Sequence, residues 1–155
     1  IIPVVTNVFD KILGCIQTIH ETSNHAPVLL KLQNILYRLV KELKSSRIAN
    51  VENVLPKMEK LLLITHYASL QSIAVEKHLP DLAALMAISL LRHVDIVAAD
   101  KLFYLAGIAC RNMKWMSLAF VFMNRYLDLL MLMLLFHVLL NLHQYLDYPQ
   151  SLPQM

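Results

Sequence analysis

An all-α fold is predicted by three features of the 155-residue sequence. The chain contains only two Gly residues, 57% of its residues are hydrophobic, and apolar residues recur at three- and four-residue steps along much of it. Sheets and nucleotide-binding loops use more glycine, at turns and wherever the backbone approaches phosphate closely. We therefore expect helices nearly throughout, in a chain that is long enough to bury a core of its own.

Proline residues and polar loops divide the chain into six expected helical segments. The first covers about residues 4–20 and ends at the polar stretch ETSNH. The second starts at Pro27, because proline suits the first turn of a helix, and its apolar residues form one stripe. The third follows Pro56, and the fourth, which starts at Pro80, has almost no polar side. The fifth and sixth, AADKLFYLAGIACRN and WMSLAFVFMNRYLDL, are joined around NMK.

The fifth and sixth segments are expected to form a tight antiparallel hairpin that crosses at Gly107. Residues four before, one before, three after and twelve after this glycine match the register of the tetratricopeptide repeat, where small residues allow close packing. The residues predicted to pack the repeat are Phe103, Ala106, Gly107, Cys110, Ala119 and Met123. Tyr126 and Met131 depart from the register, since a small residue and a proline are usual there.

Successive hairpins with short loops favour a tetratricopeptide-like α-solenoid fragment over a compact four-helix bundle. Each repeat of a solenoid buries its apolar faces against its neighbours, so a piece of one has apolar surfaces at its ends. This organisation accounts for the high content of hydrophobic residues. Because the chain begins without Met, we expect it to be the interior of a longer protein.

No motif indicates an enzyme, a cofactor site or a metal site. Gly14 and Gly107 are too few to form a phosphate-binding loop. The His residues never stand three or four positions apart, as two metal ligands on one helix face must. Cys15 and Cys110 belong to no CxxC pair and are expected to be reduced, packed thiols. Asp95 and Asp100 lie near a predicted helix start. Their carboxylates are expected to cap the free backbone N–H groups there or to interact favourably with the helix dipole.

The charge distribution gives no support for nucleic-acid binding. The net charge is only +3, and no aromatic residues alternate with the basic ones as base stacking would need. One basic cluster stands out, at Lys31, Arg38, Lys41, Lys44 and Arg47. Its spacing places several of these residues along one face of a helix, and we interpret this face as solvated.

Two long stretches resemble a known family. LLLITHYASLQSIAV at residues 61–75, and residues 88–129 with SLLRH, DKLFYLAGIA and AFVFMNRYLDL, resemble the distal α-solenoid of the largest subunit of intraflagellar transport complex B. A weaker similarity extends back through LQNILYRLVKELKSS, so the resemblance covers about residues 29–129. It rests on a long run with few gaps rather than on a short motif.

The resemblance implies a non-enzymatic scaffold without a cofactor. Members of this family carry β-propellers followed by a long tetratricopeptide-like solenoid, and they support cilium assembly. The implied partners are other intraflagellar transport subunits, and the implied location is the cilium and ciliary base, on the cytoplasmic side. No catalytic residue is known in this part of the family, so none is transferred to this chain.

The resemblance stops after Leu129, where the family continues with a polar, acidic connection and this chain reads LMLMLLFHVLLNLHQYLDYPQSLPQM. We therefore predict two units, a solenoid segment at 1–129 and a divergent tail at 130–155 with an apolar helix and a polar C-terminus. A frame change or retained non-coding sequence would explain so abrupt a junction. We expect the tail to continue the sixth helix and pack back over the hairpin, or, without a free surface, to self-associate.

A membrane association is not expected but is kept as the alternative. The apolar run at 129–140 has twelve residues, whereas a spanning helix needs about 20. Extending it to Leu146 would place Asn141, His143 and Gln144 in hydrocarbon, which is costly. The alternative function is thus a small helical membrane-associated protein anchored through residues 129–146.

Overall fold

Helices make up nearly all of the part of the chain that the computed structural model describes, which is residues 10–12, 14–16, 18–19, 25–46 and 51–146. The helices are α2 (Ala26–Ser45), α3 (Val51–Glu76), α4 (Pro80–Leu90), the short 3₁₀ helix η1 (Leu91–His93), α5 (Ala99–Asn112) and α6 (Met116–Leu146). Residues 10–12, 14–16 and 18–19 are also helical, within the first expected segment. The prediction of an all-α fold is confirmed.

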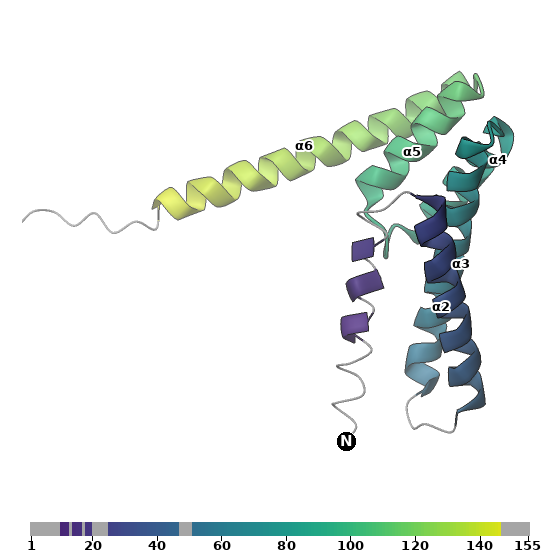
Figure 1. Ribbon diagram of the computed structural model, residues 1–155. Helices are drawn as coiled ribbons and strands as arrows, with labels where there is room; N and C mark the ends of the chain where they lie inside the picture. Colours follow the sequence, from purple (N-terminus) through teal and green to yellow (C-terminus); the bar gives the residue numbers. More distant parts are fainter. Residues whose placement is uncertain (1–9, 13, 17, 20–24, 47–50, 147–155) are drawn as a thin grey trace, which may run out of the picture.

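Helices α2 and α3 form the first antiparallel pair (Figure 1). Pro27 lies in the first turn of α2, as predicted, and the predicted apolar stripe is buried at Leu29, Leu36 and Leu43, among others. Polar groups also join the two helices, because the buried Ser69 hydroxyl of α3 lies 2.9 Å from Oε1 of Gln33 in α2. The stripe buries one side of α2, and its other side faces solvent.

Helix α3 begins six residues before the predicted start, Lys57. The sequence placed its first turn after Pro56, but the helix starts at Val51 and contains Pro56. The first four N–H groups of any helix lack a partner inside the helix. A proline at the sixth position therefore removes only one of the earliest hydrogen bonds. The apolar residues Val51, Val54 and Leu55 pack against the α2–α3 core and favour the longer helix.

The chain reverses direction after α3 and after α5 by the same kind of turn. His78 and Lys114 adopt positive φ values of 55° and 60°. In each turn the following residue donates a backbone hydrogen bond to a carbonyl five positions earlier, from Leu79 to Ala74 at 2.8 Å and from Trp115 to Cys110 at 2.9 Å. This arrangement is a Schellman motif, usually made with glycine. Two tight helix reversals are thus made here by other residues.

Each helix packs against the next one along the chain, in the order α2, α3, α4, α5 and α6. The buried residues form separate clusters along this path. One joins α2 and α3 around Leu36 and Leu61, a second surrounds Ile64 and Leu102, and a third consists of alanines from α4 and α5 such as Ala87. Packing between successive helices is the arrangement expected of a solenoid.

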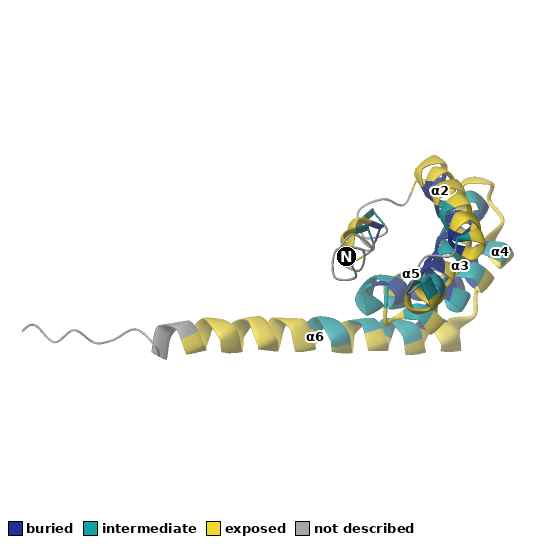
Figure 2. Cartoon of the chain, turned by 90° about the horizontal axis from the view of Figure 1, so that it is seen from below, coloured by how far each residue is buried: buried dark blue, intermediate teal, exposed yellow. Residues whose placement is uncertain are grey.

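Helix α6 is more than twice as long as its partner α5, with 31 residues against 14. Its first part lies along α5, and the rest projects away from the other helices (Figure 1). The tail therefore continues the sixth helix as predicted, without a break at residue 129 or 130. The prediction that it packs back over the hairpin is wrong for residues 131–143, all of which are exposed (Figure 2). The shorter helix α5 covers only the first part of α6, so the rest of α6 has no helix of the described structure beside it.

Candidate functional site

The crossing of α5 and α6 is built on one close contact. A Cβ atom on Gly107 would lie 3.0 Å from both Cγ and Sδ of Met123. Such a distance is shorter than ordinary van der Waals contact, so the glycine lets α6 approach α5 at this point. The sequence predicted that the helices would cross at Gly107, and the structure places it against α6.

Three of the other four residues predicted to pack the repeat are buried. Ala106, Cys110 and Ala119 are buried, and the ring of Phe103 lies 6.3 Å from that of Phe122, between centroids. Burial raises the pKa of the Cys110 thiol above its usual value, so the thiol is protonated at neutral pH. Gly107, Ala119 and Met123 border the same hollow between α5 and α6, whereas Ala106 is buried in an alanine cluster with α4. The role of the six residues as a tetratricopeptide-type packing set stays a prediction.

Tyr126, identified from the sequence as a departure from the repeat register, has an aromatic partner. Its ring centroid lies 5.2 Å from that of Tyr104, at an interplanar angle of 52°. Tilted aromatic pairs at this separation are favourable beyond the area that they bury. A pair of aromatic side chains therefore stands where a tetratricopeptide register would have a small residue. A register based on small residues gives no indication of this pair.

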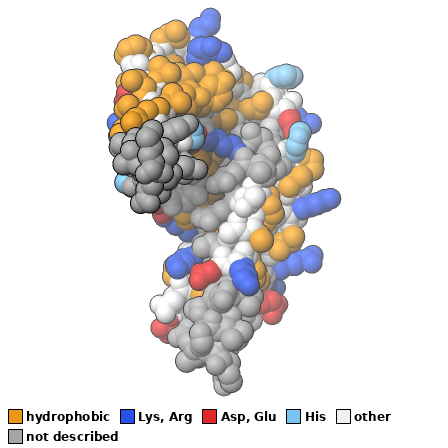
Figure 3. Space-filling model, turned by 90° about the vertical axis from the view of Figure 1, so that its left-hand side faces the viewer, with side chains coloured by type: hydrophobic (Ala, Val, Ile, Leu, Met, Phe, Trp, Pro, Cys, Tyr) orange, Lys and Arg blue, Asp and Glu red, His pale blue; other side chains and the backbone are white. Residues whose placement is uncertain are grey.

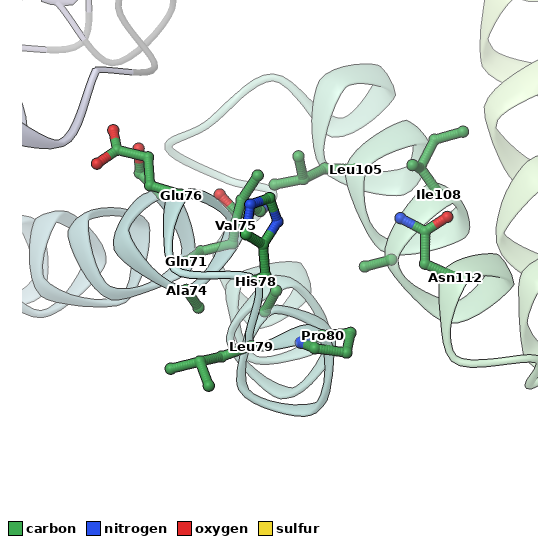
Figure 4. Close-up of a pocket in the computed structure, with 13 residues that line it drawn as sticks. Gln71, Ala74, Val75, Glu76, His78, Leu79, Pro80, Leu105, Ile108 and Asn112 are labelled. Carbon is green, nitrogen blue, oxygen red and sulfur yellow. The ribbon is translucent and has the colours of Figure 1, made fainter.

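A groove of about 630 Å³ lies where the turn between α3 and α4 faces α5 (Figure 4). Its apolar lining includes Leu79, Leu105 and Ile108, and its polar groups include Glu76 and Asn112. In the close-up the side chains come from the end of α3, the following turn, the start of α4 and α5. Apolar walls with a few polar groups can hold an apolar side chain of a binding partner. Sequence reasoning missed this groove, because it forms between segments that are distant in the chain.

A polar cluster joins α3 to the segment after η1. Lys60 Nζ lies 2.6 Å from Oδ2 of Asp95, and this hydrogen bond lowers the pKa of the Asp95 carboxyl below its usual value. Burial, together with the charge of Lys60, lowers the pKa of His93. The prediction that Asp95 serves a helix start is therefore wrong, since its partner is Lys60, whereas Asp100 does lie in the first turn of α5. The cluster is an ion pair beside a packed imidazole.

The cysteines, metal ligands and basic face were also predicted from the sequence. Cys110 is buried as expected, but Cys15 is exposed, so the prediction of a packed thiol is wrong there. Within the described ranges, no group of three His, Cys, Asp or Glu side chains could hold a metal ion. Lys31, Arg38, Lys41 and Lys44 are exposed on α2, and Arg47 lies outside the described residues. Lys44 pairs with Glu59 of α3 at 2.7 Å.

The outer half of α6, residues 131–143, is apolar on every side. Ten of its large hydrophobic side chains are between 48% and 66% exposed: Met131, Leu132, Met133, Leu134, Leu135, Phe136, Val138, Leu139, Leu140 and Leu142. Figure 3 looks from the end towards which α6 projects, and hydrophobic side chains gather in the upper part of that face. Burying any one of them fully would contribute roughly 1.5 to 3 kcal/mol.

By length and composition, α6 could also cross a membrane. The qualifying stretch, Met116–His143, has 28 residues with a mean hydropathy of 1.7, and 6% of its most apolar window is buried. The criterion is a weak one, because core helices of soluble proteins also meet it. The first part of α6 is packed against α5. The stretch Met116–His143 also contains the ion pair Arg125–Asp128, at 3.8 Å.

Comparison with known proteins gives one consistent result. Over 99 residues, the chain is 41% identical to the mouse protein named intraflagellar transport protein 172 homolog and 40% identical to the human one. It is 37% identical over 100 residues to intraflagellar transport protein 172 of Chlamydomonas reinhardtii. These matches cover 63% of this chain and only 6% of each relative.

A more distant relative extends the match. The Drosophila melanogaster protein named intraflagellar transport protein 172 homolog is 32% identical over 124 residues, or 79% of this chain and 7% of the relative. No model of a protein family matches the chain. The relatives come from insect, vertebrate and algal sources and carry the same name, so the expected resemblance is confirmed. The chain is homologous to a short segment of intraflagellar transport protein 172.

Proposed function

We propose that this chain acts as a helical-repeat scaffold segment in intraflagellar transport, supporting cilium assembly through contacts with other intraflagellar transport subunits. The homology to intraflagellar transport protein 172 carries this proposal. In this role the chain is not an enzyme and needs no cofactor. It would work at the cilium and ciliary base, on the cytoplasmic side.

The packing of the helices supports a scaffold role. Because each described helix packs against its successor, the helices form an extended array with long lateral surfaces. The groove beside the α3–α4 turn is one concave part of this surface, and Val75 and Leu79 at its rim are half exposed. A protein that works through its surface needs rigid helices in fixed order, and the tight contact of Gly107 with Met123 holds the last hairpin in that order.

The test is affinity capture from ciliated cells that express the tagged 155-residue chain. We expect intraflagellar transport subunits to be enriched, and the tagged chain to be seen at the ciliary base. The variant Gly107→Leu should lose this enrichment, because it separates α5 from α6. Gly14→Leu is the matched control, since a Cβ at Gly14 meets nothing within 4 Å. Without enrichment by the folded wild-type chain, the homology would concern the fold alone.

A small membrane-associated protein is the second candidate, because α6 has the length and hydropathy of a spanning helix. Against it, an anchor of residues 129–146 would place the polar side chains of Asn141, His143 and Gln144 in the bilayer. Flotation of the expressed chain with cell membranes distinguishes the two candidates. Recovery in the floating fraction after a salt wash would favour the membrane candidate.

A further inference from the structure

The face of α6 that packs against α5 is defined by six side chains, and it does not stop where α5 stops. Among the described side chains of α6, these six are the ones that are not exposed: Ala119, Phe122, Met123, Tyr126, Leu129 and Leu130. They recur at steps of three and four residues, as the contact positions of paired helices do. We call them the α5-facing stripe. The same spacing continues it to Met133, Phe136, His137 and Leu140.

The register of the hairpin shows where the α5-facing stripe loses its cover. Moving three residues back along α5, from Gly107 to Tyr104, moves the contact three residues forward along α6, from Met123 to Tyr126. The same register places Ala99, the first residue of α5, opposite Met131. The continuation of the stripe thus begins just beyond Ala99, the N-terminal end of α5. Its four side chains are exposed.

The charge pattern of this segment indicates what kind of surface fits it. Between Arg125 and the end of the chain there is no Lys or Arg, and the acidic residues are Asp128 and Asp147. A helix that lies on an anionic membrane surface carries basic residues along one polar face, and such a face is missing here. The uncovered part of α6, residues 131–143, would extend about 20 Å at 1.5 Å per residue, short of a bilayer core of about 30 Å.

We propose that the outer half of α6 binds the outer half of α6 of a second copy of this chain. An uncharged apolar helix is complementary to another one, and two identical charge-free surfaces meet without repulsion. The pairing extends an interface that the chain already uses, because the second helix takes the place that α5 would occupy if it were longer. The continuation of the α5-facing stripe, Met133, Phe136, His137 and Leu140, makes the contact.

The two helices run antiparallel in this pair. Each α5 lies on the inner half of its own α6, residues 116–130. In a parallel pair the two copies of α5 would therefore lie next to each other and collide. In an antiparallel pair each α5 lies beyond the end of the other outer half. The arrangement has two-fold symmetry, so that the same residues of both copies form the contact.

The experiment compares two double variants of the full 155-residue chain, by light scattering after size-exclusion chromatography over a wide range of concentration. Met133→Glu with Leu140→Glu places charges on the continuation of the α5-facing stripe. Leu135→Glu with Leu142→Glu places the same charges on the opposite side of the helix, since successive residues turn by about 100°. All four side chains are exposed in the single chain, so folding is retained and circular dichroism verifies it.

We expect the wild-type chain to form pairs, or larger assemblies of pairs. The variant Met133→Glu with Leu140→Glu should be a monomer, because the buried charge raises the dissociation constant of the pair roughly a hundredfold or more. The opposite-side variant should still pair. A monomeric wild-type chain would overturn the proposal. Equal loss in both variants would also overturn it, because nonspecific adhesion does not depend on the face. Flotation of the wild-type chain with phosphatidylcholine vesicles, in place of pairing, would assign the segment to lipid instead.

Discussion

At the scale of single residues, the absence of a side chain at Gly107 controls the last hairpin. The Cγ and Sδ atoms of Met123 occupy the space where a Cβ would be. The thioether is flexible, so a single methyl group at Gly107 could be accommodated by a shift of Met123. A branched side chain has no such room. The two helices must then separate or rotate, and the aromatic contacts of Phe103 and Tyr104 with α6 are disturbed with them.

The variant Gly107→Leu should lower the free energy of unfolding by about 1 to 3 kcal/mol, through overpacking. Urea denaturation followed by circular dichroism measures this change. Combining it with Met123→Ala should restore part of the loss, since the smaller side chain leaves space for the leucine. Gly14→Leu is the control and should not destabilise the chain, because the position is open. If Gly107→Leu left stability unchanged, the close contact would have no energetic role.

Local patterns predicted single residues well where one physical effect dominates. The close approach at Gly107 could be identified because small residues at a fixed spacing indicate close helix packing, and Pro27 because proline favours a first turn. Asp95 could not, since its partner Lys60 lies 35 positions away in the chain. Pro56 misled the prediction because tertiary packing of Val54 and its neighbours outweighs one lost hydrogen bond.

At the scale of elements, α6 consists of two halves in different environments within one unbroken helix. The inner half has a covered face and the outer half has none in the described structure. The sequence predicted this change of character after Leu129, because the resemblance stops there and the polar residues become sparse. It could not show that the helix continues straight instead of folding back, since that depends on whether the hairpin offers a free apolar surface at the right place.

Removing residues 131–155 should leave the thermal midpoint of the folded chain unchanged, because the outer half contributes no packing to the hairpin. The measurement needs a protein concentration at which the full chain is monomeric, since association raises apparent stability. A shorter chain that ends at Val121 should melt at a clearly lower temperature, as it lacks Met123 and Tyr126. An equal drop for both truncations would mean that the outer half packs on the other helices.

At the scale of the whole molecule, packing between successive helices makes stability a local property. The α2–α3 cluster around Leu36 and the alanine cluster around Ala106 share no buried residue. In such an arrangement, stability is approximately a sum of contributions from each unit and its neighbours. The overall course of the chain was predicted as a solenoid from short loops and two-sided apolar helices. The groove beside α5 was not, since grooves depend on how helix ends meet.

Leu36→Ala should destabilise one end of the molecule more than the other. Leu36 is 1% exposed, and truncating a buried leucine costs about 2 to 5 kcal/mol. Hydrogen exchange should therefore accelerate at the amides of α2 and α3, while those of α5 and the inner half of α6 change much less. Ile35→Ala, next to it but 63% exposed, is the control. A uniform acceleration across all helices would indicate a single cooperative unit.

The uncovered half of α6 also bears on the lifetime of the chain in a cell. Molecular chaperones and quality-control proteases recognise incompletely folded or unassembled proteins by exposed apolar surfaces of this kind. A chain whose α6 is occupied by a second copy would escape that recognition, and an unoccupied one would be a target for degradation. Cellular abundance would then follow occupancy, so that this protein would accumulate only as far as its assembly proceeds.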